Sequence, residues 1–364
     1  MESDMKKIVL IVLMLFVAAC DNSAKKDVQD TKPTIKIGVV TSLSGKFAES
    51  GKNVQAVLDF ALKDAAPKNV NIEYVYEDFG YEAAHAALAV QKLINVDKVD
   101  AIISWSAVAG NVIAPIADKA GIFHFGISND KAIAKGKYNF IHWTQSEFLA
   151  DKVVDLIAEH EPKSVAMLVV YQPGLQQTGD YVEAKLSDKG IKTERANFTI
   201  DNKDFAMMVD KFKAKDFDVW YISALPPSLD VLLKVIFEKN VNKPLIAVDS
   251  FLFSNMKDRL EGMKYVTPPE GDDELLQRVN EKTGSSNYFS LGYVYDAGYI
   301  LANIYSELYD KFGHVPSAEE IADRILEIRK FKGAVGDIYV DDDGVFQSEA
   351  VVKQIKDGKS VLVK

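Results

Sequence analysis

The sequence predicts an α/β fold built from two doubly wound parallel sheets, and three observations lead to this prediction. Short apolar runs of strand length alternate with amphipathic helical stretches along most of the chain. The alternation stops and begins again near residue 145, so it forms two successive series. About 330 residues follow a polar leading segment, and a body of that length favours two domains.

The first series has the regular βα rhythm of a parallel sheet. Repeated units of this kind place helices on both faces of the sheet. The helical stretch at 51–65 is typical, because Val54, Leu58 and Ala61 recur on one of its faces. We expect strands at 35–40, 71–76, 100–104 and 122–126, and helices at 51–65, 81–95 and 111–119.

The second series repeats the rhythm and is followed by a less regular tail. We expect its helices at 147–160, 177–189, 204–214 and 228–238, and its strands at 164–171, 193–198, 218–223 and 244–248. In the tail we expect helices at 272–281, 291–309 and 317–331, and two final strands at 338–340 and 350–355.

The first twenty residues have the pattern of a bacterial secretory signal. Lys6 and Lys7 precede an apolar run at 8–19 that is much shorter than the ~20 residues needed to span a bilayer. We therefore expect residues 1–19 to be a signal peptide that is removed. Residues 20–33 are polar and aperiodic, which predicts a flexible tether.

Cys20 is the single cysteine of the chain. It could be an incidental or buried thiol, but the small residues before it make the segment similar to the lipobox of bacterial lipoproteins. That resemblance implies lipidation of the Cys20 sulfur. Acyl chains there would anchor the protein to the cell membrane, with the body facing the periplasm or the exterior.

The charge and cysteine content exclude several classes of protein. Lys and Arg number 43 against 53 Asp and Glu, and the net charge of −10 argues against nucleic-acid binding. No cysteine follows Cys20, so the body has no internal disulfide. No later segment has the length and hydrophobicity of a membrane helix. We expect a monomer.

The residues needed for catalysis or metal binding are missing from the sequence. The five histidines are scattered, and no G-x-S-x-G motif is present. Residues 45–52 have one residue too many between their glycines for a phosphate loop and lack its Lys-Ser/Thr ending. The loop at Asp341 carries Val352 where a calcium loop needs Glu. We therefore expect no enzyme activity, no cofactor and no metal.

A series of short motifs points to a known family. Taken in order, they resemble the leucine/isoleucine/valine-binding protein family, the branched-chain amino-acid branch of the periplasmic-binding-protein type I fold. The motifs are Leu43-Ser44-Gly45 with Ser50-Gly51, the passage 114–122, Lys203-Asp204-Phe205 with Phe217-Asp218-Val219, Tyr295-Asp296-Ala297, the F-x-G-x-x-G sequence at 331–336, and 341–344.

The resemblance implies two lobes that are joined by three crossovers and close on a small solute like a hinge. The crossovers are expected near Thr144, Val266 and Gly336. Lobe 1 would then comprise 34–144 plus 267–336, and lobe 2 would comprise 145–266 plus 337–364. The expected partners are a small-molecule ligand and an ABC permease.

The resemblance also implies where a ligand is held. Ligands of such sheets bind at the carboxyl ends of strands. Ser106 and Ala107 correspond to the first-lobe carboxylate loop, although Ser106 could equally cap a helix. Asp249 matches the acid that binds an ammonium group, although it could be a turn or N-cap residue. The other expected contacts are Ile127 and Ser128 in the first lobe, and Tyr171, Gln177 and Leu225 in the second.

Aromatic residues at the strand ends could form apolar walls or pack in the core. Phe47, Trp105 and Phe251 are the candidates. No Arg occurs in any of these loops, which disfavours a dianionic ligand.

Four functions are compatible with the sequence, and the first is favoured. This is a solute receptor of an ABC importer for an amino-acid-like ligand. The second is a sensory receptor of the same fold for an amide or an aromatic acid. The third is an enzyme, which the missing catalytic residues disfavour. The fourth is a structural lipoprotein with an empty cleft, because Ala107 and Leu225 stand where the family has Ser and Tyr.

Overall fold

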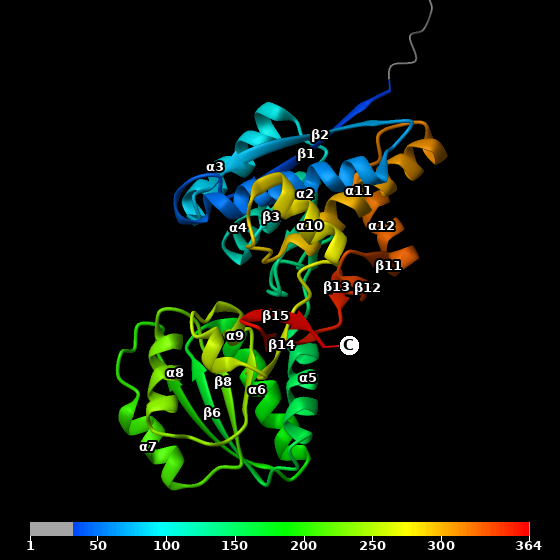
Figure 1. Cartoon of the computed structure of the whole chain (residues 1–364). Coiled ribbons are helices and arrows are strands. Elements are labelled where there is room, and N and C mark those ends of the chain that lie inside the picture. The colour runs from blue at the N-terminus through cyan, green and yellow to red at the C-terminus, as the bar shows by residue number, and fades with distance from the viewer. Residues whose placement is uncertain (1–31, 364) are drawn as a thin grey trace, which may run out of the picture. The chain divides into compact units, whose positions relative to one another are not determined.

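A computed structural model describes residues 32–363 of the chain. The expected signal segment and Cys20 lie outside the described residues. Residues Thr34–Lys364 form one compact unit, which contains two sheets (Figure 1). Each sheet has its own cluster of buried apolar side chains, so we call the two parts the first and the second lobe.

The first lobe contains an eight-stranded sheet in the order β11-β12-β13-β5-β4-β3-β1-β2. From β2 to β13 the neighbouring strands are parallel, and β12 and β11 are added antiparallel at one edge. The strands are β1 (Thr34–Thr41), β2 (Asn71–Asp78), β3 (Ala101–Trp105), β4 (Phe123–Ile127), β5 (Asn139–His142), β11 (Lys330–Gly333), β12 (Gly336–Val340) and β13 (Val345–Ser348).

The helices of the first lobe cover both faces of its sheet, as repeated βα units require. One group consists of α2 (Ala48–Ala65), α10 (Asp273–Thr283) and α11 (Leu291–Phe312), with α12 (Ala318–Ile328) packed on α11. The other group consists of α3 (Ala83–Lys92) and α4 (Ala107–Ala120). Short helical turns occur at η1 (Gly45–Phe47) and η2 (Leu93–Asp97).

The second lobe contains a seven-stranded sheet in the order β15-β14-β10-β9-β8-β6-β7. Its strands from β7 to β10 are parallel, and β14 and β15 are antiparallel additions. The strands are β6 (Ser164–Val170), β7 (Lys192–Phe198), β8 (Val219–Ser223), β9 (Leu245–Val248), β10 (Lys264–Thr267), β14 (Val351–Lys356) and β15 (Lys359–Leu362).

The helices of this lobe also lie on both faces of the sheet (Figure 1). One face carries α5 (Ser146–Ala158) and α6 (Pro173–Asp188), and the other carries α7 (Ala206–Ala214) and α8 (Ser228–Glu238). The short α9 (Ser250–Phe253) follows β9, and η3 (Lys257–Leu260) follows α9. The expected fold class of two doubly wound α/β lobes is confirmed.

The chain passes between the lobes three times. The first crossover covers residues 143–145, and the second covers 268–272. The third crossover was expected near Gly336, but it lies at residues 349–350. Gly336 has φ +98° and begins β12 of a hairpin with β11, and β13 then pairs with β5, so residues 337–348 belong to the first lobe.

Buried hydroxyl groups link the first crossover to α11 and to the end of β13, just before the third crossover. The Thr144 Oγ1 lies 2.7 Å from the Tyr293 hydroxyl and 2.8 Å from the Ser348 Oγ. A mostly buried ion pair between Glu270 and Lys353 connects the second crossover to β14. These contacts fix where the chain leaves each sheet.

Asp296 explains two of the sequence motifs. Its fully buried carboxylate accepts hydrogen bonds from the backbone N–H groups of Ala334 (2.6 Å) and Val335 (3.3 Å). A Cβ on Gly333 would lie only 2.2 Å from the Asp296 Oδ1, so the residue there must be glycine. The Tyr-Asp-Ala and Phe-x-Gly motifs thus form one contact, which joins α11 to the β11–β12 hairpin.

Position 51 also requires glycine for a specific steric reason. In the first turns of α2 the helix backbone passes over the end of β1, and a Cβ at position 51 would lie 1.9 Å from the Ser42 carbonyl oxygen. A backbone oxygen cannot turn aside as the end of a side chain can. The close approach places the start of α2 beside the carboxyl edge of the first sheet.

We therefore expect Gly51→Ala to lower the free energy of unfolding by about 3 kcal/mol or more, because the added methyl overpacks against fixed backbone. Urea denaturation, with Lys52→Ala on the exposed side of the same helix as the control, measures the effect. A Gly51→Ala protein as stable as the wild type would contradict this explanation of the Ser-Gly motif.

Candidate functional site

A cavity of about 370 Å³ is lined by residues of both lobes. Its size falls in the range of small-molecule sites. The lining residues are Phe47, Ser50, Tyr81, Trp105, Ser106, Ala107, Ile127, Ser128, Asn129, Trp143, Gln172, Phe253, Asn287, Phe289 and Ser290. None of these described residues is charged, and six are aromatic.

The start of α4 forms one end of the cavity. The sequence predicted this helix at 111–119, but it begins at Ala107. The backbone N–H groups of its first turn have no carbonyl partner within the helix. The partial positive charge of this helix end favours an anion in front of it. Ser106 and Ala107 both face the cavity here.

Ser106 has an unusual conformation and a free hydroxyl. Its φ of +85° is rare for a residue with a side chain and indicates strain that the surrounding structure maintains. Its buried Oγ has no hydrogen-bond partner within the described part of the chain. The side chain does not cap α4, which was the alternative to a binding role. A buried hydroxyl without a hydrogen-bond partner raises the free energy of the protein. A ligand atom that accepts a hydrogen bond from it would therefore bind more favourably.

Ser128 provides a second hydroxyl. Its Oγ accepts a hydrogen bond from the Asp130 backbone N–H at 3.1 Å, which leaves its own hydrogen to donate. Asn129, the next residue, also lines the cavity. Ser128, Asn129 and the start of α4 thus offer hydrogen-bond donors to a ligand, and none of them is a positively charged side chain.

One aromatic wall consists of Phe47, Tyr81 and Trp105. The ring centroids of Phe47 and Tyr81 lie 4.4 Å apart, and Trp105 lies 5.9 Å from Phe47 and 6.1 Å from Tyr81. The Trp105 Nε1–H donates to the Ser290 Oγ at 2.8 Å, which fixes the indole ring. These rings present an apolar surface to the cavity.

The second aromatic wall consists of Trp143, Phe289 and Phe253. Trp143 stacks on the buried Tyr293 at 4.5 Å and lies 5.3 Å from Phe289, whose ring lies 6.3 Å from Phe253. Trp143 belongs to the first crossover, Phe289 to the loop before α11, and Phe253 to α9. Two separate clusters of aromatic rings thus line the cavity.

The loop before α11 is fixed to α2 by a buried amide. The Nδ2 of Asn53, which is fully buried, donates to the Ser285 Oγ and to the Asn287 carbonyl oxygen, both at 3.0 Å. This loop supplies Asn287, Phe289 and Ser290 to the cavity. The α2 helix, which Gly51 holds against β1, thereby positions one side of the cavity.

Six of the eleven candidate contact and wall residues lie around this one cavity: Phe47, Trp105, Ser106, Ala107, Ile127 and Ser128. The other five do not line it. Tyr171 is 60% exposed, and Leu225 packs against the second-lobe core. Gln177 is exposed and accepts a hydrogen bond from the Ser146 Oγ at 3.1 Å, a contact between α6 and α5.

Asp249 lies in a charged group beside the crossovers and not at the cavity. Burial raises the pKa of its carboxyl to about 6, and the negative charge of Glu270 adds to this shift. A hydrogen bond with Thr267 and the positive charge of Lys353 oppose it. Asp249 also has a positive φ of 55° and precedes α9. Asp249 is therefore not among the lining residues that could pair with the ammonium group of a ligand bound at Ser106.

Nine lining residues were not predicted from the sequence: Ser50, Tyr81, Asn129, Trp143, Gln172, Phe253, Asn287, Phe289 and Ser290. Trp143 directly follows β5, a strand that was not predicted from the sequence, and 287–290 precede a helix without following any strand, so the rule applied to the predicted strand ends did not find them. Phe251 was considered as a wall residue, but it is fully buried in the second-lobe core, and Phe253, two residues later, lines the cavity.

Two further findings concern membranes and metals. Within residues 32–363, no helix combines the length and hydrophobicity that crossing a bilayer requires. The same residues contain no group of three or more His, Cys, Asp or Glu side chains that could hold a metal ion.

The fold and the cavity define the class of the protein as a two-lobed α/β binding protein. The chain belongs to the periplasmic binding protein family, whose model matches residues 34–359. The protein is therefore a binding protein and not an enzyme, as the sequence predicted. Comparison with curated proteins gives no match.

Solved structures with the same fold include binding proteins for different ligands. The leucine-binding protein LivK of Thermotoga maritima MSB8 has 21% identity and a TM-score of 0.73, over 91% of this chain and 98% of LivK. LivJ of Streptococcus pneumoniae, in complex with isoleucine, has 21% identity and a TM-score of 0.72, over 91% and 99% of the two chains. An R. palustris solute-binding protein in complex with 4-hydroxybenzoate has 18% identity and a TM-score of 0.73, over 91% and 95%.

The pKa of Asp249 gives a prediction for stability. Its folded value of about 6 exceeds the unfolded value near 3.9, so its favourable contribution is complete below about pH 4 and is lost as the pH rises through about 6. We expect Asp249→Asn to be more stable than the wild type at pH 7.5 by about 1–2 kcal/mol, and equally stable at pH 4. Urea denaturation at both pH values measures the difference.

The exposed Asp258→Asn serves as the control for removal of a charge in the same lobe. A wild type at least as stable as Asp249→Asn at pH 7.5 would contradict the view that burial of the Asp249 carboxylate is unfavourable.

Proposed function

We propose that this protein is the extracytoplasmic solute receptor of an ABC importer and that its cavity binds a small monocarboxylic acid with an aromatic or otherwise flat apolar body. The observation that carries the proposal is the combination of an unpaired helix N-terminus and Ser106 hydroxyl with aromatic walls and no charged lining residue. The carboxylate would lie at Ser106 and α4, and the apolar body between the aromatic walls.

The absence of an acidic side chain from the described lining distinguishes between the two ligand classes that the sequence left open. An α-amino acid carries an ammonium group, which is costly to bury without a negative partner. A carboxylate needs only hydrogen-bond donors and the helix end. The geometry therefore favours an aromatic acid over an amino acid, and a solved structure of the same fold in complex with 4-hydroxybenzoate is consistent with that choice.

The other parts of the proposal come from the sequence. Cys20 would carry the lipid anchor after removal of residues 1–19, and residues 20–33 would connect it to the body. Hinge movement of the lobes would enclose the ligand, and the enclosed form would be delivered to a membrane permease.

A thermal-shift panel tests the ligand class. Benzoate and 4-hydroxybenzoate at about 100 times Kd should stabilise the protein by ~2.7 kcal/mol, and L-leucine and L-isoleucine should not. Ser106→Ala should weaken 4-hydroxybenzoate at least tenfold, because it removes a hydrogen bond to a charged group, and should affect the neutral 4-hydroxybenzamide much less. Stabilisation by the amino acids alone would refute the proposed ligand.

The lipid anchor is tested separately by Cys20→Ser. We expect the wild type to fractionate with membranes and to carry acyl chains on its N-terminal residue, as seen by mass spectrometry. The variant should lose both properties while it retains the thermal stability of its body. A wild-type chain that is cleaved elsewhere, or an unmodified Cys20, would rule out the anchor.

A further inference from the structure

We infer that the second lobe recognises the ligand through Phe253 and Gln172, and that Phe253 determines how strongly ligand binding is coupled to movement of the lobes. The inference rests on the proposed function and extends it to residues that the sequence did not single out. It also assigns a role to the row of aromatic rings that joins the two lobes.

The first argument comes from the origin of the lining residues. Within the described part of the chain, Gln172 and Phe253 are the lining residues that belong to the second lobe; the others belong to the first lobe or to the first crossover. A ligand shifts an equilibrium between two arrangements only through contacts that differ between them. Contacts with first-lobe residues do not depend on where the second lobe stands. In the arrangement that the structure describes, these two side chains are the second-lobe groups through which the coupling can pass.

The second argument comes from the position of Phe253. Its ring lies 6.3 Å from that of Phe289, at an interplanar angle of 60°. Phe289 lies 5.3 Å from Trp143, which stacks on the buried Tyr293. Phe253 is thus the second-lobe end of a row of rings that begins in the first-lobe core. Because Phe289 is 40% exposed, a flat ligand in the cavity can add to the Phe253–Phe289 contact and strengthen the link between the lobes.

Gln172 is held so that its amide can donate to the cavity. Its Oε1 accepts a hydrogen bond from the Leu175 backbone N–H at 2.9 Å and so caps α6. The oxygen is therefore occupied, and the NH₂ group makes no hydrogen bond within the described part of the chain. The side chain can offer a donor to a polar group on the ligand.

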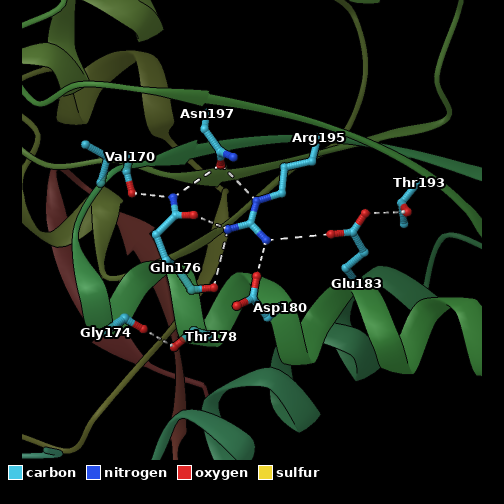
Figure 2. A network of polar contacts seen from close by, with 9 residues as sticks. All are labelled: Val170, Gly174, Gln176, Thr178, Asp180, Glu183, Thr193, Arg195 and Asn197. Atoms are coloured by element: carbon cyan, nitrogen blue, oxygen red, sulfur yellow. Dashed lines mark hydrogen bonds and ion pairs between the residues drawn. The ribbon is translucent and has the colours of Figure 1, made fainter.

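Polar contacts with β7 and β6 hold the first turns of α6, the helix that follows Gln172, and Figure 2 shows these contacts. The Arg195 guanidinium on β7 donates to the Gln176 Oε1 at 2.6 Å and to the Gln176 carbonyl oxygen at 3.4 Å, and it pairs with Asp180. The Gln176 Nε2 donates to the Val170 carbonyl oxygen at 2.8 Å. Gly179 lies beneath the guanidinium, since a Cβ there would be 3.3 Å from its Cζ.

Gly174, in the first turn of α6, allows the two lobes to approach beside Gln172. A Cβ at position 174 would lie 3.1 Å from the Asn129 Nδ2 of the first lobe. A larger side chain at position 174 would hold α6 away from Asn129 without removing any lining residue. Gly174→Val therefore provides a steric test that is independent of the aromatic row.

The experiment uses a distance reporter in the full chain. Cys20→Ser removes the only cysteine, so Leu88→Cys on α3 and Met207→Cys on α7 introduce two labelling sites, which are 70% and 83% exposed in the native residues. Fluorescence energy transfer between dyes at these sites reports the separation of the lobes, and quenching of tryptophan emission by added 4-hydroxybenzoate reports binding. Phe312→Ala, which removes a 40% exposed ring far from the cavity lining, is the matched control.

We expect 4-hydroxybenzoate to raise energy transfer in the reporter protein and in Phe312→Ala. Phe253→Ala should still quench on binding, with a Kd raised roughly tenfold, but should lose most of the ligand-induced change in transfer. Gly174→Val should have low transfer with and without the ligand. Without any ligand, Phe253→Ala should already have lower transfer than the reporter protein.

The outcomes separate the two proposals. If the reporter protein binds none of the acids, the proposed ligand is wrong, and the ligand-free comparison still tests the role of Phe253. Equal ligand-free transfer in Phe253→Ala and the reporter protein overturns the inference in that case. If the acid binds and the change in transfer is the same in both proteins, the inference is wrong although the proposed function stands.

Discussion

The first turn of α4 leaves backbone N–H groups without carbonyl partners, and the cavity in front of it contains no charged side chain. The arrangement of the site follows from this electrostatic constraint. The βα geometry of a parallel sheet brings helix starts to the carboxyl edge of the sheet, so the donors are provided by the fold itself. Ser106, with its strained φ and unpaired Oγ, adds one more donor at the same place. A site with donors, aromatic walls and no acid is suited to a carboxylate that lacks an ammonium group.

Close backbone contacts keep the groups around α4 in place. Gly51 lets α2 pass over the end of β1, and Asn53 of α2 fixes the loop that carries Asn287, Phe289 and Ser290. The Asp296 carboxylate fixes the β11–β12 hairpin in the same lobe. The Glu270–Lys353 ion pair lies where the chain passes between the lobes. The cavity is therefore built by packing and hydrogen bonding that leave its own polar groups free for a ligand.

The period of the apolar residues predicted both lobes and most of the strands correctly, because parallel strands that are buried on both faces leave a strong local signal. The third crossover was misplaced because Gly336 belongs to a turn of an antiparallel hairpin. A glycine-rich turn has the same sequence pattern in a hairpin as in a linker between domains. Ser106 and Trp105 could be found from the rule that ligands lie at strand ends. The same rule reached the segment after β9, but it could not tell that Phe251 is buried in the core while Phe253 lines the cavity. Phe289 follows no strand, and its role arises from a contact between segments that lie far apart in the sequence.

The central claim is that the cavity accepts a carboxylate and rejects an ammonium group. The most direct measurement is the ratio of Kd values, by isothermal titration calorimetry, for 3-phenylpropionate and L-phenylalanine, which differ only by the ammonium group. Our account predicts that 3-phenylpropionate binds at least roughly tenfold more tightly, a difference of about 1.4 kcal/mol or more. Tighter binding of L-phenylalanine would contradict it and would show that an acidic side chain reaches the ligand.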